Sequence, residues 1–129
     1  LYKSGIVRKH GDLKPENILI DDMGRPVITD FGVALEAGRP TNRERGGTPG
    51  YSCNVEDSRA DVYALGRLLV DMIRGIDAKE KDVPYPLSKL VETTRKKKRD
   101  KNGAESCDAE GIPEMREFIK MTEELLLLL

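Results

Sequence analysis

The stretch "HGDLKPENILIDD", residues 10–22, places a histidine, an aspartate, a lysine and an asparagine ahead of a short aliphatic run. The run "NILIDD" and a second one, "RPVITD", are separated only by Met23 and Gly24. Two β-rich runs with a glycine between them are typical of a β-hairpin, because glycine adopts the positive φ of a tight turn at little cost. The sequence therefore predicts a hairpin whose first strand follows directly after a polar loop.

Polar groups stand at both ends of this predicted hairpin. Asp12, Lys14 and Asn17 come before its first strand. The tripeptide "DFG", which begins at Asp30, comes after its second strand. Because a hairpin brings its two ends together, Asn17 and Asp30 are expected to be neighbours. Carboxylate and amide oxygens suit Mg²⁺, an ammonium suits phosphate, and a second carboxylate can serve as a base, so the pattern indicates a site for a metal-bound phosphate.

Four motifs in order give the sequence a close resemblance to the protein kinase family. "HGDLKPEN" is similar to the catalytic loop H-R-D-L-x-x-x-N, and "DFG" follows thirteen residues after the asparagine. "GTPGY", residues 47–51, resembles the substrate-facing end of the activation loop. "DVYALG", residues 61–66, resembles the start of the large central helix. The resemblance covers about residues 1–75, and the remainder fits the helical rest of the same lobe.

The resemblance implies an α+β, mainly helical fold: the C-terminal lobe of a protein kinase, with a short β-hairpin that carries the catalytic and DFG loops. Residues 1–129 would form this partial kinase domain. The glycine-rich loop and the β-strand lysine of the N-terminal lobe are not found in these residues, so that lobe is an expected partner. The expected divisions are a catalytic loop at 10–17, an activation segment at 30–57, a central helix at 58–74 and C-terminal helices within 87–129.

The resemblance also implies roles for individual residues. Asp12 and Lys14 are expected to be catalytic, Asp12 by orienting the substrate hydroxyl and accepting its proton. Asn17 and Asp30 would hold Mg²⁺ against the phosphates of ATP. A lysine two residues after the catalytic aspartate, together with Thr48, is typical of kinases that modify serine or threonine. The residues expected to bind the nucleotide are Lys14, Glu16, Asn17, Leu19 and Asp30.

Other polar residues of this region have structural interpretations. In the family the histidine of the catalytic loop packs against the phenylalanine of "DFG", so His10 is expected to be structural. Asp61 fits a helix-capping pattern that begins at Ser58, and in the family it also anchors the backbone of the catalytic loop. Asp21 and Asp22 are interpreted as turn residues.

The sequence departs from the family in three places near the loop. Gly11 replaces an arginine that normally receives a phosphate, so we expect activity that does not depend on loop phosphorylation; loss of activity in Thr41→Ala solely through missing phosphorylation would contradict this. Arg8 and Lys9 form an insertion before the histidine, which is expected either to bulge or to supply a substitute cation. "SCNVED" stands where the family has "APE", and the late arginine that pairs with that glutamate is expected to be missing with it.

Composition limits the other classes of protein. The 129 residues suit one domain, and the net charge of -1 gives no general attraction to nucleic acid or to a membrane surface. No apolar run reaches the length of a membrane span. Cys53 and Cys107 form no CxxC pair and are expected to be free thiols of an intracellular, cytoplasmic protein. The basic run "RKKKRDK", residues 95–101, is interpreted as a solvated loop or helix end, with an anionic docking site as the alternative.

The function expected from these features is transfer of phosphate from Mg-ATP to a serine or threonine of a protein substrate. A pseudokinase or interaction module without catalysis is an alternative, because the "APE" region is altered. A small-molecule phosphotransferase of the aminoglycoside or choline kinase type is a further alternative, because such enzymes often carry "HGD". The strings "LKPEN", "DFG" and "GTPGY" favour the protein kinases.

Overall fold

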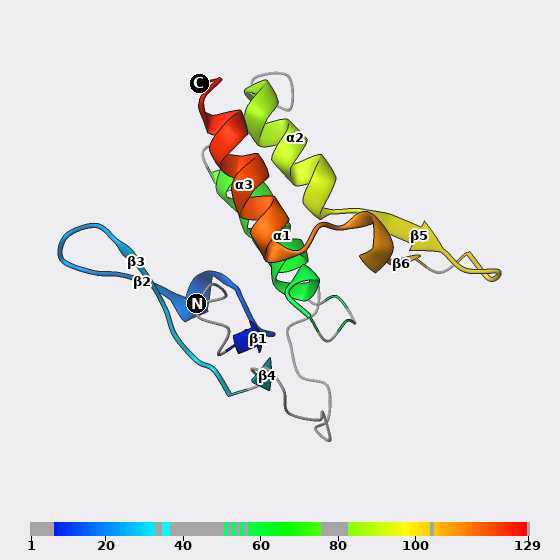
Figure 1. The fold of residues 1–129 in the computed structure, drawn as a ribbon, viewed down its shortest axis with the longest axis horizontal. Helices are drawn as coiled ribbons and strands as arrows, with labels where there is room; N and C mark the ends of the chain where they lie inside the picture. The colour runs from blue at the N-terminus through cyan, green and yellow to red at the C-terminus, as the bar shows by residue number, and fades with distance from the viewer. Residues whose placement is uncertain are drawn as a thin grey trace.

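The computed structural model describes residues 7–32, 35–36, 51, 53, 55, 57–75, 83–103 and 105–128. The helical part consists of α1 (Arg59–Gly75), α2 (Tyr85–Thr94) and α3 (Met115–Leu126), which lie side by side (Figure 1). Most of the predicted activation segment, including Thr41 and Thr48, lies outside the described residues. None of the helices in the described part of the chain has the length and apolar character that a bilayer crossing requires.

The core lies between the three helices. The predicted central helix, 58–74, agrees with α1 to within one residue at each end. Helix α2 starts two residues before the predicted range 87–129, and α3 lies within that range. Apolar residues of the three helices, joined by two residues outside them, form one cluster of buried side chains: Cys53, Val62, Tyr63, Leu90, Ile112, Met115 and Phe118.

Helices α1 and α2 come very close at Gly66. A Cβ atom added there would lie 2.6 Å from Thr94 Cβ and 2.8 Å from Arg95 Cδ, and it would be closer still to Thr94 Oγ1. Thr94 is fully buried, so it has no free space into which it could move. The two helices can therefore keep this spacing only while residue 66 lacks a side chain.

Replacing Gly66 by alanine is expected to lower the free energy of unfolding by about 1–3 kcal/mol, because the new methyl group overpacks the contact with α2. Gly75→Ala is the matched control in the same helix, since nothing lies within 4 Å of an added Cβ there. Urea unfolding of the 129-residue chain measures both. Equal stability of the two variants would contradict the close contact.

The predicted hairpin is present. Strand β2 (Ile18–Ile20) pairs antiparallel with β3 (Pro26–Ile28), with Leu19 opposite Val27. The turn has Gly24 at φ +78°, as the sequence predicted. Asp21 Oδ1 accepts hydrogen bonds from the backbone N–H groups of Met23 and Arg25, which confirms its interpretation as a turn residue. The short helix η1 (Pro15–Asn17) leads into β2.

The insertion before His10 forms a bulge. Strand β1 (Val7–Lys9) pairs with β4 (Leu35–Glu36), and the register shifts between Val7 and Lys9, so Arg8 is the extra residue. Lys9 Nζ donates a hydrogen bond to the backbone carbonyl of Val55 at 2.9 Å. The insertion therefore bulges at Arg8, and Lys9 is bonded to the backbone of a neighbouring segment.

The basic run, 95–101, begins at the C-terminal end of α2, where Arg95 is the cap residue, so the prediction of a helix end is confirmed there; it is wrong for Lys97–Arg99, which form a strand. Strand β5 (Lys97–Arg99) pairs with β6 (Glu105–Cys107), after which the short helix η3 (Ala109–Gly111) leads toward α3. The hairpin projects from the helices in Figure 1. Glu105 pairs with Lys97 at 3.5 Å and with Arg99 at 2.7 Å. These pairs partly neutralise an exposed basic surface, which favours the solvated interpretation over an anionic docking site.

The prediction of free thiols is also wrong. Cys53 and Cys107 form a disulfide, with their Cα atoms 5.7 Å apart and 54 positions apart in the chain. Cys53 lies in the buried cluster of the helical core, and Cys107 ends β6. The fold brings the two together through contacts that the spacing of two isolated cysteines does not encode.

Candidate active site

Asp61, at the start of α1, fixes the backbone of the polar loop. Its Oδ2 accepts a hydrogen bond from His10 N–H at 2.7 Å, and its Oδ1 accepts one from Gly11 N–H at 2.9 Å. The carboxylate is only 1% exposed. Hydrogen bonds to a buried charged acceptor are stronger than those between neutral groups, so the loop is firmly attached to the helical core.

His10 connects the loop to the hairpin. Its Nδ1 accepts a hydrogen bond from Asp12 N–H at 3.1 Å, and its Nε2 lies 2.8 Å from the carbonyl oxygen of Thr29. A backbone N–H can only donate and a carbonyl can only accept, so the ring is neutral with its proton on Nε2. The fully buried ring packs edge-on against Phe31, with centroids 4.8 Å apart. The predicted packing of His10 against Phe31 is confirmed.

Gly11 occupies a backbone conformation that other residues avoid. Its φ is +90°, in the region where the side chain of an L-residue is strained. The conformation is what directs the N–H groups of His10 and Gly11 together onto Asp61. The backbone conformation therefore gives a physical reason for glycine at position 11. This reason is separate from the expected effect of replacing the family's arginine.

Gly11→Ala is expected to lower the free energy of unfolding by about 1–2 kcal/mol, the cost of placing a Cβ at left-handed φ. Gly11→Asn should cost less, since asparagine tolerates this region better than alanine does. Urea unfolding compares the two. An alanine variant as stable as the parent, or more stable, would show that the loop does not hold this conformation in solution.

Asp12, Lys14 and Asn17 converge as the sequence predicted. Lys14 Nζ lies 3.7 Å from Asp12 Oδ2, and the two side chains are 25% and 18% exposed. Asn17 Nδ2 donates to the backbone oxygen of Asp12 at 2.8 Å and lies 3.3 Å from its Oδ2. Because Nδ2 is directed at Asp12, Oδ1 is the amide atom of Asn17 that is suited to a cation.

The pairing of the hairpin extends to the residue before Asp30. Thr29 N–H donates to the carbonyl oxygen of Asn17 at 2.9 Å, so Asp30 is the next residue beyond the last paired position. Asp30 is exposed and has φ +60°, and its Oδ1 accepts a weak hydrogen bond from Gly32 N–H at 3.3 Å. A non-glycine residue held at positive φ often marks a functional position.

Glu16 and Leu19 lie on the surface beside this cluster. Glu16 is exposed on η1, and Leu19, on β2, is 55% exposed. Leu68 and Met72, on α1, line a shallow pocket of about 330 Å³ under the loop together with Pro15, Ile18 and Asp71.

A contact between Tyr51 and α1 was not predicted. The hydroxyl of Tyr51 donates a short hydrogen bond to Asp71 Oδ2, and Arg67 Nε donates to Asp71 Oδ1 at 3.0 Å. The hydrogen bond from Tyr51 lowers the pKa of Asp71, whereas burial, followed by the bond to Asp71, raises the pKa of Tyr51. The spacing of Arg67 and Asp71, four residues apart on a helix, could have indicated the ion pair but not its attachment to the end of "GTPGY".

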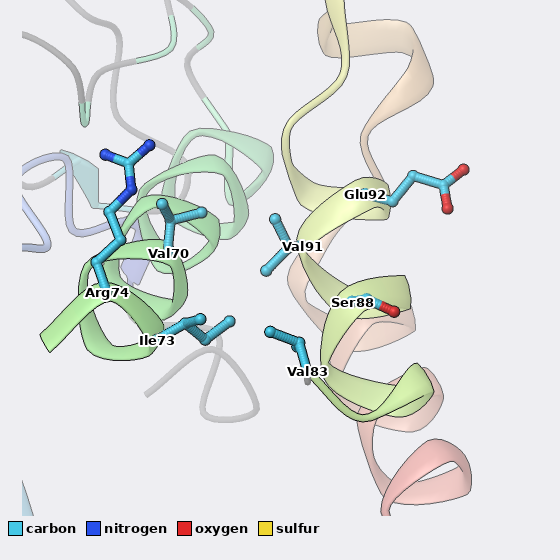
Figure 2. A pocket seen from close by; sticks show the side chains of 7 residues that line it. All are labelled: Val70, Ile73, Arg74, Val83, Ser88, Val91 and Glu92. Atoms are coloured by element: carbon cyan, nitrogen blue, oxygen red, sulfur yellow. The ribbon is translucent and has the colours of Figure 1, made fainter. Parts of the chain in front are cut away.

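A second hollow lies between α1 and α2, away from this cluster. It has a volume of about 530 Å³, and none of residues 10–32 lines it. Figure 2 shows Val70 and Ile73 on α1 facing Val83 and Val91, while the charged ends of Arg74 and Glu92 point away from the apolar floor. The hollow therefore offers mainly apolar surface.

Comparison with known proteins agrees with the motifs and the geometry. A family model described as "Protein kinase domain" matches residues 1–126. The chain is 36% identical over 95 residues to the probable serine/threonine-protein kinase pknA2 of Bifidobacterium longum, a match that covers 67% of the chain and 12% of that protein. It is 38% identical over 84 residues to the serine/threonine-protein kinase sgk-1 of Caenorhabditis elegans, covering 59% of the chain and 18% of that protein.

A third relative comes from mouse. The phosphorylase b kinase gamma catalytic chain, liver/testis isoform, is 38% identical over 89 residues, covering 58% of the chain and 21% of that protein. The chain thus spans between 12% and 21% of the length of these relatives. The chain belongs to the eukaryotic-type serine/threonine protein kinase family.

Proposed function

We propose that this chain carries the catalytic half of a serine/threonine protein kinase that transfers the terminal phosphate of Mg-ATP to a hydroxyl of a protein substrate. The observation that supports this most is the contact network of Asp12, Lys14 and Asn17, together with the hydrogen bond between Asn17 and Thr29, the residue before Asp30. Phosphoryl transfer depends mainly on positioning and on charge stabilisation, and these four residues have the groups for both.

The donor atoms fit a magnesium ion that is shared with a nucleotide. Within the described ranges, no group of three or more His, Cys, Asp and Glu residues could hold a metal ion on its own. Mg²⁺ in such enzymes is held by one or two protein oxygens together with substrate phosphates. Asn17 Oδ1 and the carboxylate of Asp30 would supply the protein oxygens, and the bound ion would neutralise charge on the phosphates.

The remaining polar residues would handle the proton and the transferred group. Asp12 would orient the substrate hydroxyl and accept its proton, and Lys14, 3.7 Å from Asp12, would stabilise the negative charge of the phosphoryl group. Glu16 and Leu19 lie at the edge of the cluster, where Leu19 would contact the underside of adenine. His10, neutral and buried, would take no part in proton transfer and would hold the loop in register with the hairpin.

The exposed β2–β3 hairpin is proposed to receive an N-terminal kinase lobe. Apolar side chains with exposures between 38% and 66% lie on both of its faces and just after its second strand: Leu19, Ile20, Val27, Ile28 and Phe31. Apolar surface concentrated beside a polar cluster is typical of a binding interface. The lobe would close the site over the nucleotide from this side.

Nucleotide-dependent thermal stabilisation of the full-length gene product tests the metal and nucleotide part of the proposal. Mg-ATP is expected to raise Tm, and both EDTA and the variant Asp30→Asn should remove most of the shift. Asp22→Asn, an exposed turn residue of the same hairpin, is the matched control and should keep the shift. A shift that is independent of Mg²⁺ and of Asp30 would favour an interaction module over a kinase.

A further inference from the structure

The stretch that follows "GTPGY" is attached to the rest of the chain at several points. The hydroxyl of Tyr51 bonds to Asp71 on α1, and the carbonyl of Val55 accepts from Lys9 Nζ. Ser58 Oγ accepts a hydrogen bond from the N–H of Met115 at 2.9 Å, where α3 begins. The described residues between 51 and 58 are Tyr51, Cys53, Val55, Asp57 and Ser58, called here the anchored stretch, and they are attached to α1, β1 and α3.

Asp57 and Arg59 add a further attachment just before α1. Arg59 Nη2 lies 2.7 Å from Asp57 Oδ2, and Arg59 Nη1 donates to the carbonyl of Ala109 at 3.2 Å. The hydrogen bonds from Arg59 lower the pKa of Asp57 below its usual value of 3.8. All these contacts are noncovalent and do not respond to oxidation or reduction.

The Cys53–Cys107 bond is the covalent attachment of the anchored stretch. It joins the stretch to the base of the β5–β6 hairpin, where Asp108 N–H also bonds to the carbonyl of Lys96 at 2.8 Å. Cys53 is 5% exposed and packs in the core, whereas Cys107 is partly exposed. Thiol reagents therefore have better access to Cys107 than to Cys53.

We propose that the Cys53–Cys107 pair is a redox-controlled anchor that sets the position of the anchored stretch for protein-substrate binding. This inference rests on the proposed kinase function, because the substrate-facing motif ends at Tyr51, two residues before Cys53. The family's "APE" motif is replaced by "SCNVED" in this region of the sequence. The disulfide links the same stretch to the base of the β5–β6 hairpin, and a chemical signal can open it.

A low-molecular-weight disulfide such as glutathione disulfide closes the anchor. The thiolate of Cys107 attacks one glutathione sulfur, forms a mixed disulfide and releases one glutathione thiolate. The thiolate of Cys53 then attacks Cys107 Sγ and releases the second glutathione. Two protein thiols lose two electrons and two protons, and one glutathione disulfide becomes two glutathione thiols, so the exchange balances. Excess reduced thiol reverses both steps.

The effect is expected on the protein substrate and not on the nucleotide. Asp12 and Asn17 belong to a loop that Asp61 holds through separate contacts. Opening the disulfide leaves those contacts in place and releases one attachment of the anchored stretch. The KM for a protein or peptide substrate should therefore rise while the KM for ATP stays unchanged, which a general loss of folded enzyme would not produce.

The test compares the full-length gene product in glutathione disulfide and in dithiothreitol, with the oxidation state of Cys53 and Cys107 confirmed by alkylation and mass spectrometry. Reduction is expected to raise the peptide KM about 5-fold or more, a typical coupling between two sites. Cys107→Ser should show the raised KM in both buffers, and Cys53→Ala with Cys107→Ser should be no worse than Cys107→Ser alone. Hydrogen exchange of residues 51–58 should be faster after reduction.

Equal peptide KM values in both buffers would overturn the redox anchor. Hydrogen exchange separates this failure from failure of the kinase proposal, because it requires no activity. If no phosphate is transferred in either buffer but exchange of residues 51–58 still depends on the disulfide, the proposed function fails while the anchor stands as a structural device. If exchange is the same in both states, the anchor itself is wrong.

Discussion

Asp12→Asn in the full-length gene product is expected to lower kcat for phosphate transfer by about 10²–10⁴-fold, the usual contribution of a positioned general base. Asparagine has nearly the same shape but cannot accept the proton of the substrate hydroxyl. The hydrogen bond from Asn17 Nδ2 goes to the backbone oxygen of Asp12 at 2.8 Å, so it is kept in the variant. The loss should therefore appear in kcat, with little change in the KM for ATP.

Steady-state kinetics with a peptide substrate measures this effect. Asp22→Asn changes the same chemical group at an exposed position and should leave kcat within about twofold, as expected for a surface substitution. A kcat for Asp12→Asn close to that of the parent would remove Asp12 from the chemistry. The assignment of this loop as catalytic would then fail.

Asp61→Ala is expected to lower the free energy of unfolding by about 2–5 kcal/mol, because it leaves two buried backbone donors without their acceptor. These donors are the N–H groups of His10 and Gly11, at 2.7 and 2.9 Å from the carboxylate. Asp61→Asn keeps the shape but offers only one acceptor oxygen, so its loss should be smaller. The parent is expected to be the most stable, Asp61→Asn intermediate and Asp61→Ala the least stable.

Urea unfolding of the 129-residue chain gives these free energies. Glu123→Ala, an exposed acidic residue on α3, is the control and should change stability by no more than about 0.5 kcal/mol. If the alanine variant does not fold, the asparagine variant still reports on the lost acceptor. Stability of Asp61→Asn equal to that of the parent would show that the loop is not held by this carboxylate.

The elements that could be predicted from the sequence are those encoded locally. Helix α1 has apolar residues at helical spacing and a glycine at its end, so its bounds agree with the prediction to within one residue. The β2–β3 hairpin has short β-rich runs around Gly24, whose φ is +78°. The hydrogen bond between Asn17 and Thr29, the residue before Asp30, follows from the pairing of the two strands.

Contacts between distant segments could not be predicted in this way. Cys53 and Cys107 lie 54 positions apart, and no local pattern pairs them. The β5–β6 hairpin begins in a run of cations that has no alternation of apolar and polar residues, so the usual strand signal is missing. Its pairing instead uses cross-strand ion pairs with Glu105. The bond between Tyr51 and Asp71 likewise depends on the packing of a loop against α1.

Gly11 could be predicted from the sequence only in part. The sequence indicated an unusual residue between His10 and Asp12, and the resemblance to kinases connected it with a lost phosphate-binding arginine. The structure adds a φ of +90° at this position. That value arises because two consecutive N–H groups must point at one carboxylate, a requirement that is visible only once α1 is placed against the loop.

Phosphate transfer from radiolabelled Mg-ATP by the full-length gene product, with identification of the modified amino acid, tests the central proposal most directly. Label is expected on serine or threonine of a protein substrate, and it should be lost in Asp12→Asn and Asp30→Asn. The kinase proposal is contradicted if the folded parent protein binds Mg-ATP but transfers no phosphate to any serine or threonine. It is also contradicted if both variants transfer phosphate as fast as the parent.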